Sequence, residues 1–184
     1  MPIIALTGTM GAGKGTVAEL LKKKGFEYHS YSAVISEEAE RHGYKPTRET
    51  LRKFGNLLRA ESGNIGILSK RLLAKIKTNK VVLDGVRNIA EINELRQRKD
   101  FFVIGVVADE ELRFKRIKER RRKGDPVTLE AFKEIDGKEN LGYESGQEIQ
   151  KCLENADFLI LNNSTTKELE EKIDNILDEI GKKS

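Results

Sequence analysis

The strongest constraint on the fold is a glycine-rich segment near the N-terminus, Gly8 to Thr16, which reads Gly-Thr-Met-Gly-Ala-Gly-Lys-Gly-Thr. An apolar run at 2–6 precedes it, and apolar residues at 17, 20 and 21 follow it, so the pattern predicts a strand, a loop and a helix. The spacing from Gly8 to Gly13 and Lys14 matches the G-x-x-x-x-G-K phosphate-binding loop, whose glycines let successive backbone N–H groups turn towards a triphosphate. This segment, the phosphate loop, predicts binding of a nucleoside triphosphate with Lys14 on its β- and γ-phosphates.

The hydroxyl residue of the phosphate loop is displaced by one position. The usual pattern has Ser or Thr directly after the lysine to hold Mg²⁺, whereas this chain has Gly15 there and Thr16 next. Mg²⁺ would therefore be held by phosphate oxygens, water and a carboxylate from elsewhere in the chain. Lys-Gly-Thr in such a loop resembles adenylate kinases and their nucleoside monophosphate kinase relatives. The resemblance implies ATP and Mg²⁺ as cofactors, and a phosphate contact surface made of Gly8, Met10, Gly11, Ala12, Gly13, Lys14, Gly15 and Thr16.

Composition narrows the class of protein. The chain has 184 residues, which suits one domain, and no apolar run long enough to span a bilayer or to act as a signal segment, so we expect a cytoplasmic protein with no membrane partner. The single cysteine, Cys152, excludes an internal disulfide and is expected to be buried. A net charge of +4 suits an anionic partner, either nucleotide or nucleic acid. The oligomeric state stays open between monomer and homodimer.

Predicted strands and helices alternate along the rest of the chain. Further strands are expected at 26–30, 81–85, 101–107 and 158–161, and helices around 34–42, 46–58, 68–76, 89–95, 113–123, 125–142, 149–153 and 165–180. Right-handed crossovers then give a three-layer α/β fold of the P-loop NTPase class with a five-stranded parallel sheet. We expect one domain with its core at 1–30, 80–109 and 155–184, acceptor-binding helices at 31–79 and an arginine-rich lid at 110–145.

A carboxylate and an arginine follow the predicted strand at 81–85. Asp84 ends this strand at the edge where open parallel sheets bind ligands, so it is a candidate for Mg²⁺, with Asp109 after the next strand as a rival. Asp84-Gly85-Val86-Arg87 resembles the Asp-Gly-Phe-Pro-Arg segment of adenylate kinases. The resemblance implies that Asp84 holds Mg²⁺ through water and that Arg87 grips the acceptor phosphate. The alternative role for Asp84 is to cap the following helix.

The basic segment from Arg113 to Lys123 is similar to the lid of the same family, where two arginines follow another after a gap of three. That similarity implies that Arg116 contacts the ATP and that Arg120 and Arg121 close on the transferring phosphoryl group, whose spread negative charge suits guanidinium groups. A solvated basic helix or a nucleic-acid surface is the alternative. The segment from Lys115 to Lys123 contains no aromatic residue for base stacking, which argues against nucleic acid.

The acceptor region matches the family least well. Ser30 to Ser36 has neither the Asp nor the Arg found in adenylate kinases. The expected acceptor contacts are therefore Ser32, Arg87 and Arg59. Arg59 is chosen over Arg41 and Arg48 because it follows the apolar pair Leu57 and Leu58. The chain also resembles dephospho-coenzyme A kinases, which share the loop, the sheet and an Asn before the last helix, here Asn162 or, as we predict for ATP contact, Asn163.

These observations together predict a Mg²⁺-dependent kinase that moves the γ-phosphoryl of ATP to a nucleotide-like small molecule. A nucleoside or deoxynucleoside monophosphate is favoured, because no carboxylate stands at Ser30 to Ser32 to deprotonate a hydroxyl and an ionised phosphate needs no base. Asp84 or Glu37 could supply that base, so dephospho-coenzyme A kinase remains an alternative. A nucleotide-dependent switch or a nucleic-acid-associated ATPase is the alternative from another class.

Overall fold

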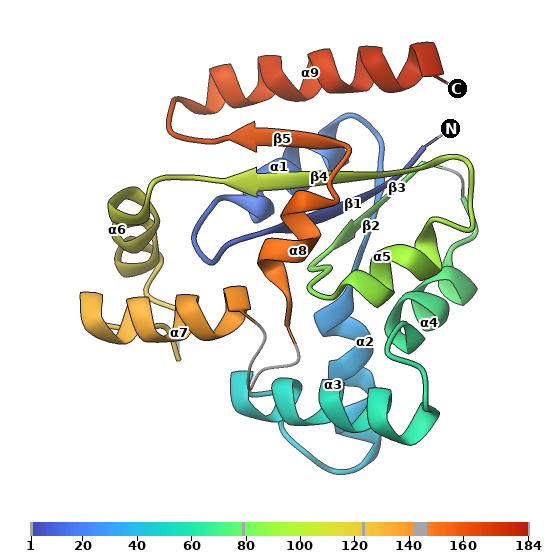
Figure 1. Ribbon diagram of the computed structural model, residues 1–184, viewed down its shortest axis with the longest axis vertical. Helices are drawn as coiled ribbons and strands as arrows, with labels where there is room; N and C mark the ends of the chain where they lie inside the picture. The colour runs from blue at the N-terminus through green and yellow to red at the C-terminus, as the bar shows by residue number, and fades with distance from the viewer. Residues whose placement is uncertain (1, 79, 123, 142–146, 184) are drawn as a thin grey trace.

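Five parallel strands form one sheet in the order β2-β3-β1-β4-β5 (Figure 1). The computed structural model describes residues 2–78, 80–122, 124–141 and 147–183. The strands are β1 (Ile3–Gly8), β2 (Glu27–Ser30), β3 (Val81–Asp84), β4 (Phe101–Val107) and β5 (Phe158–Leu161). The predicted α/β class, the strand number and the parallel pairing are confirmed. β1 lies at the centre, between β3 and β4, so the phosphate loop leaves the sheet from its middle strand.

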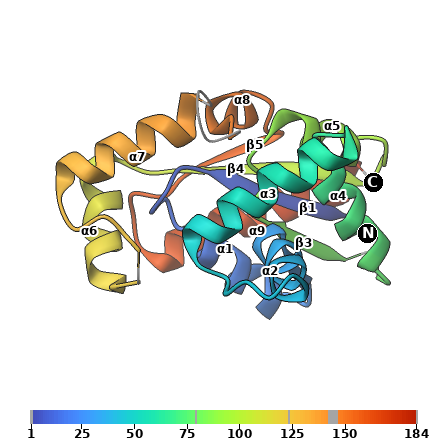
Figure 2. The same ribbon diagram turned by 90° about the horizontal axis from the view of Figure 1, so that it is seen from below.

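Helices cover both faces of this sheet (Figures 1 and 2). They are α1 (Lys14–Lys23), α2 (Tyr31–Arg41), α3 (Arg48–Ser62), α4 (Ile67–Lys75), α5 (Ile89–Leu95), α6 (Glu110–Arg120), α7 (Leu129–Leu141), α8 (Ile149–Glu154) and α9 (Thr166–Lys183). One core cluster joins β1, β3 and β4 to α2, α3, α4, α5 and α8. A second cluster joins the other sheet face to α1 and α9. Because both faces are covered, the central strands β1, β3 and β4 are near-continuous apolar runs, whereas the edge strand β2 is mostly polar.

Two helices lie beyond the carboxyl ends of β4 and β1 rather than on either sheet face. Figures 1 and 2 show α6 and α7 together at this end of the molecule. They enclose a third apolar cluster, the loop cluster, in which Met10 of the phosphate loop meets Ile117 and Phe132, with Phe114, Leu129 and Ile135 packed around them. In this structure α6 and α7 therefore pack against the phosphate loop itself. A role as a closing lid remains a prediction.

Local signals predicted most helix ends correctly, but not the start of α7 or the end of α6. Thr165 accepts the backbone N–H of Glu168 at 3.3 Å and starts α9, as its capping-box spacing predicted. Asp125 and Pro126 do not start α7. That helix begins at Leu129, where the Thr128 hydroxyl accepts the N–H of Ala131 at 3.2 Å. The Asp125 carboxylate instead forms an ion pair with a guanidinium of α6, so it is not available as a cap.

Two further expectations concern α6 and the cysteine. The basic helix expected over 113–123 ends at Arg120, and Lys123 lies outside the described residues, as does the expected end of α7 at 142. Cys152 is buried as predicted, and burial raises the pKa of its thiol to about 12. Within the described residues, no helix combines the length and the apolar character needed to cross a bilayer.

Candidate active site

The phosphate loop has the backbone that its glycines predict. Gly8, Gly11 and Gly13 have φ values of 142°, 79° and 101°, a region that side chains rarely adopt. A Cβ atom on Gly8 would lie 2.0 Å from the carbonyl oxygen of Val106, so only glycine fits where the loop passes β4. Gly13 is the N-cap of α1, whose first N–H groups carry the positive end of the helix dipole.

Lys14 lies inside the loop and is partly buried. Its Nζ donates to the carbonyl oxygens of Gly8 at 2.6 Å and Thr9 at 3.0 Å. Burial and, next, the positive charge of Arg87 lower the pKa of Lys14 from 10.5 to about 8, whereas the carboxylates of Asp84 and Glu139 oppose the shift. The ammonium group is therefore held in a site that favours its loss of charge until an anion arrives.

The same electrostatic neighbours show which predicted residues the fold brings together. Asp84 at the end of β3, Arg87 in the following loop and Arg120 at the end of α6 all act on the charge of Lys14. These three predicted residues therefore lie near the loop lysine, although Arg120 is far in the sequence from Asp84 and Arg87. Glu139 of α7 joins them, a residue that the sequence analysis did not single out.

Asp84 has a partner on the neighbouring strand. The Tyr28 hydroxyl of β2 donates to Oδ2 of Asp84 at 3.0 Å. Burial together with the Asp84 charge raises the pKa of Tyr28 to about 12, so the phenol keeps its proton and remains a donor. The rival carboxylate, Asp109, is exposed at the start of α6. Asp84 acts on the charge of Lys14, and a metal role for either carboxylate remains a prediction.

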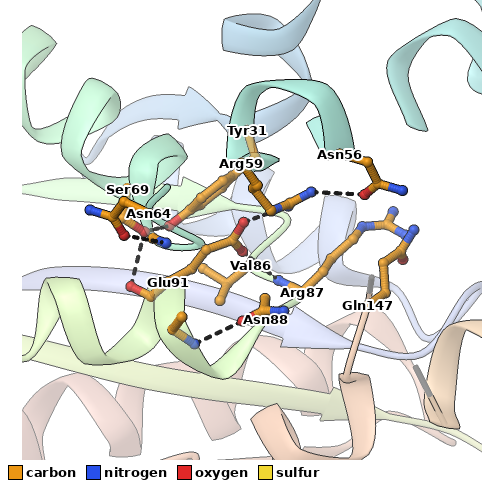
Figure 3. Close-up of polar contacts among 12 residues, drawn as sticks. Tyr31, Asn56, Arg59, Asn64, Ser69, Val86, Arg87, Asn88, Glu91 and Gln147 are labelled. Carbon is orange, nitrogen blue, oxygen red and sulfur yellow. Dashed lines mark hydrogen bonds and ion pairs between the residues drawn. The ribbon is translucent and has the colours of Figure 1, made fainter. Parts of the chain in front are cut away.

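The acceptor side contains two arginines joined through one buried carboxylate (Figure 3). Glu91 of α5 is fully buried and accepts from Arg59 Nη2 at 2.6 Å and from the backbone N–H of Arg87 at 3.1 Å. Burial raises the pKa of Glu91, and the Arg59 guanidinium opposes that shift. The Arg87 guanidinium donates to Gln147 at 2.6 Å and lies 3.3 Å from the carboxylate of Glu139. Both predicted acceptor arginines therefore have carboxylate partners within the chain.

The remaining acceptor candidates are less engaged with this site. The Ser32 hydroxyl is exposed and lies 3.2 Å from that of Ser30. Arg41 is 71% exposed and pairs with Glu38 on the surface, and the side chain of Arg48 lies outside the described part of the chain. These contacts do not test whether Arg59 or Ser32 binds an acceptor, so acceptor binding by both residues remains a prediction.

A pocket of about 140 Å³ opens beside the start of α1. Gly13, Thr16, Arg116 and Asn162 line it, together with Ser164, Thr166 and Leu169. Asn162 is buried and donates from Nδ2 to the carbonyl of Ala12 at 2.8 Å. Asn163 instead accepts the backbone N–H of Asp109 at 3.0 Å and is exposed. Of the two asparagines, Asn162 lines the pocket, and ATP contact by Asn163 stays a prediction.

The two expected lid arginines differ in their surroundings. Arg120 forms two hydrogen bonds with the carboxylate of Asp125, at 2.7 and 2.9 Å, which orient its guanidinium. The charge of this guanidinium contributes to the lowered pKa of Lys14. Arg121 is exposed and ends α6 in the left-handed conformation with a φ of 48°. Its contact with a transferring phosphoryl group remains a prediction.

Comparisons with known proteins show the family and the fold. A protein-family model described as an AAA domain matches residues 4–139. The UPF0200 protein of Pyrococcus horikoshii is 34% identical over 185 residues, which cover 97% of each chain. The chain belongs to the UPF0200 family and carries an AAA domain. Among solved structures, TT1252 from Thermus thermophilus has a TM-score of 0.63 and 21% identity, and it covers 97% of both chains.

A shikimate kinase from Bacteroides thetaiotaomicron also shares the fold. Its TM-score is 0.62 at 14% identity, with 96% of this chain and 98% of that chain covered. These solved structures establish the P-loop kinase-like fold, and at such low identity they establish the fold alone. The predicted P-loop kinase-like fold is confirmed.

The residues present fit a nucleotide with Mg²⁺. Among the described residues, the hydroxyls of Thr9 in the loop and Ser164 at the pocket are buried without a hydrogen-bond partner. Unpaired buried hydroxyls of this kind are rare, and a bound ligand would give them partners. Across 2–78, 80–122, 124–141 and 147–183 there is no group of three metal-ligating side chains. Asp84, the carboxylate predicted to serve the metal, suits Mg²⁺, which keeps several waters and takes oxygen ligands from phosphates.

Tyr28 and Glu139 are the site residues that sequence reasoning missed. Tyr28 lies on β2 opposite Val82, two residues before the pair formed by Ser30 and Asp84, and this register becomes visible only once the sheet order is known. Glu139 lies three residues after Asp136 and thus on one side of α7, a spacing that could have marked a polar helix face. Neither carried a local motif.

Proposed function

We propose that this protein is an ATP- and Mg²⁺-dependent kinase that transfers the γ-phosphoryl group to a nucleotide-like small molecule, most specifically a nucleoside or deoxynucleoside monophosphate. The fold supports nucleotide-dependent phosphoryl transfer in general. The observation that carries the specific proposal is the convergence of Lys14, Asp84, Arg87 and Arg120 from three separate segments of the chain. Phosphoryl transfer needs positioning and positive charge more than covalent chemistry, and this group supplies both.

On the donor side, the chain's own groups would hold the triphosphate. The N–H groups of the phosphate loop and the Lys14 ammonium would bind the β- and γ-phosphates, with the Thr16 hydroxyl on the α-phosphate. Bound Mg²⁺ would neutralise phosphate charge, and Asp84 would orient its water ligands, with Tyr28 fixing one carboxylate oxygen. The Arg116 guanidinium lines the pocket beside Gly13 and Thr16, so it would stack on the nucleobase.

On the acceptor side, Arg87 is the stronger candidate for a phosphate contact. Its side chain is 39% exposed, whereas that of Arg59 is 14% exposed and paired with a fully buried carboxylate. Arg59 would orient the acceptor loop through Glu91, and Arg87 would exchange the Glu139 carboxylate for the acceptor phosphate. Figure 3 shows both guanidinium groups extending towards the amides of Asn56 and Gln147, which could contact the rest of the acceptor.

A hydroxyl acceptor, as in dephospho-coenzyme A kinases, is the second candidate. Two carboxylates, Asp84 and Glu139, act on Lys14, and either could take the proton of a hydroxyl. Glu37, the other base considered from the sequence, pairs with Lys75. The fold shared with a shikimate kinase is compatible with this candidate. For a nucleic-acid partner, the cations of α6 offer less, because Arg113 and Arg120 are engaged in ion pairs within the chain.

The test is an ADP-release assay with ATP and Mg²⁺ over nucleoside and deoxynucleoside monophosphates and dephospho-coenzyme A. We expect one monophosphate to stimulate release, with about a 100-fold or larger loss of turnover in Lys14→Ala and Arg87→Ala. Arg98→Ala, which removes a surface arginine paired with Asp100, is the matched control and should behave as the unaltered protein. Slow release that no acceptor stimulates would contradict the proposal.

A further inference from the structure

Arg113 of α6 is a buried charge that the proposed reaction does not use. Its side chain is 8% exposed and forms two hydrogen bonds, at 2.7 and 3.0 Å, with the carboxylate of Asp136 on α7. The guanidinium also lies 5.1 Å from the ring centre of Phe132 in the loop cluster. Asn140 donates to the second oxygen of Asp136 at 3.2 Å. Arginine is rarely buried unless it is paired, so this buried ion pair indicates a structural or functional role for Arg113.

The same guanidinium reaches the backbone of the phosphate loop. Arg113 Nη1 donates to the carbonyl oxygen of Met10 at 3.1 Å, and its Nε donates to that of Ala108 at 3.1 Å. The backbone of α6 is equally close, because a Cβ atom on Gly11 would lie 2.7 Å from the Arg113 carbonyl oxygen. The Arg113 side chain therefore binds the Met10 carbonyl, and its main-chain carbonyl leaves no room for a side chain at Gly11.

A second carbonyl of the loop is held in the same way from another segment. Asn162, which follows β5, donates to the carbonyl oxygen of Ala12 at 2.8 Å, with Arg116 Nη1 at 3.5 Å from the same oxygen. Asn162 is only 4% exposed, so this bond is shielded from water. Two alternate carbonyls of the loop, at 10 and 12, are thus bound by buried side chains.

The geometry of the peptide bond links the direction of these carbonyls to the direction of the N–H groups that follow them. In a trans peptide the C=O and the N–H that follows it point in opposite directions. Holding the Met10 and Ala12 carbonyls towards Arg113 and Asn162 therefore directs the N–H groups of Gly11 and Gly13 away from them. Those N–H groups are among the ones that the loop pattern assigns to the phosphates.

We propose that Arg113 and Asn162 are positioning residues that hold the Met10 and Ala12 carbonyls outward and so orient the Gly11 and Gly13 N–H groups for phosphate before any ligand binds. Asp136 keeps the guanidinium in place. The inference rests on the proposed function, since it assumes that the loop binds phosphate. Glycine at 11 and 13 leaves this backbone free to take other conformations, which is why external contacts are needed to select one.

The test separates this role from mere stability. Arg113→Met with Asp136→Leu replaces the ion pair by apolar side chains of similar size, which often preserves folding, but it removes the donor to Met10. Arg98→Met with Asp100→Leu changes a surface Arg–Asp pair and is the matched control. Two single variants keep the test possible if the double variant does not fold. Arg113→Lys keeps a charged donor at this position, and Asn162→Leu removes the contact to the Ala12 carbonyl.

The readout is titration of each protein with inorganic pyrophosphate, followed by the amide signals of ¹⁵N-labelled glycine and by calorimetry. We expect about tenfold weaker binding in the double variant, a smaller loss in Arg113→Lys and Asn162→Leu, and shifted Gly11 and Gly13 signals before pyrophosphate is added. Unchanged affinity and unchanged glycine signals in the folded variants would overturn the inference and leave the proposed function standing. Failure of the unaltered protein to bind pyrophosphate would overturn both.

Discussion

The ionisation of Lys14 gives the most quantitative prediction, because its pKa lies close to neutral pH. Burial and the Arg87 charge lower that pKa from 10.5 to about 8. A bound triphosphate brings negative charge next to the ammonium group and raises its pKa again, since an opposite charge favours the charged form. ATP binding is therefore coupled to proton uptake, and the affinity must fall as the pH rises above the pKa of the free protein.

The size of the effect follows from the pKa. The affinity should fall by about tenfold for each pH unit above 8, equivalent to about 1.4 kcal/mol, and by about 30-fold between pH 7 and pH 9.5. Two other groups with raised pKa values, Tyr28 and Cys152, stay protonated over this range because their values are about 12. The second ionisation of a phosphate, near pH 6, is already complete.

The assay is calorimetric titration with ATP and Mg²⁺ at half-unit steps from pH 7 to 9.5. Lys14→Arg is the control, because a guanidinium stays protonated throughout and should give a nearly flat profile, even if the affinity itself is lower. A flat profile for the unaltered protein would refute the argument. An equally steep profile for Lys14→Arg would also refute it, since another group would then be titrating.

Three further substitutions test other parts of the site. Gly13→Ala should abolish ATP binding, since the φ of Gly13 is 101° and the new Cβ would lie 2.3 Å from Nδ2 of Asn162. A near-normal ATP affinity of this variant, measured by calorimetry, would contradict the prediction. Glu91→Leu should lower the free energy of unfolding in urea by about 3 kcal/mol or more, because it leaves the Arg59 charge buried and unpaired, and a loss below about 1 kcal/mol would disagree. Arg116→Ala should weaken ATP binding more than pyrophosphate binding, because its side chain lines the pocket assigned to the base. Equal losses for the two ligands would disagree with that assignment.

Local patterns predicted the architecture because each strand and most helix ends carry their own signal. The strand Val81–Asp84 is a short buried apolar run, and Thr165 with Glu168 forms a capping box that needs only four residues to recognise. The phosphate loop is likewise contiguous. Such features depend on neighbours in the sequence, so they can be predicted without knowledge of the tertiary fold.

Features that depend on contacts between particular side chains were not predictable in the same way. Asp125 resembles a helix cap, but Arg120 binds its carboxylate and the helix begins at Leu129. Arg59 resembles a free acceptor arginine, but its partner Glu91 lies 32 residues away and bears no local mark. Each of these outcomes is decided by an ion pair between side chains, five residues apart in the first case and 32 in the second, which intrinsic helix propensity does not contain.

The measurement that tests the central claim most directly follows the transferred group itself. The protein would be incubated with Mg²⁺, with each candidate acceptor and with ATP that carries ¹⁸O in its γ-phosphoryl group. The masses of the products would then be measured by mass spectrometry. The account predicts labelled phosphoryl on one nucleotide acceptor, and none in Lys14→Ala. Label found only in inorganic phosphate, whatever acceptor is supplied, would contradict it and indicate an ATPase instead.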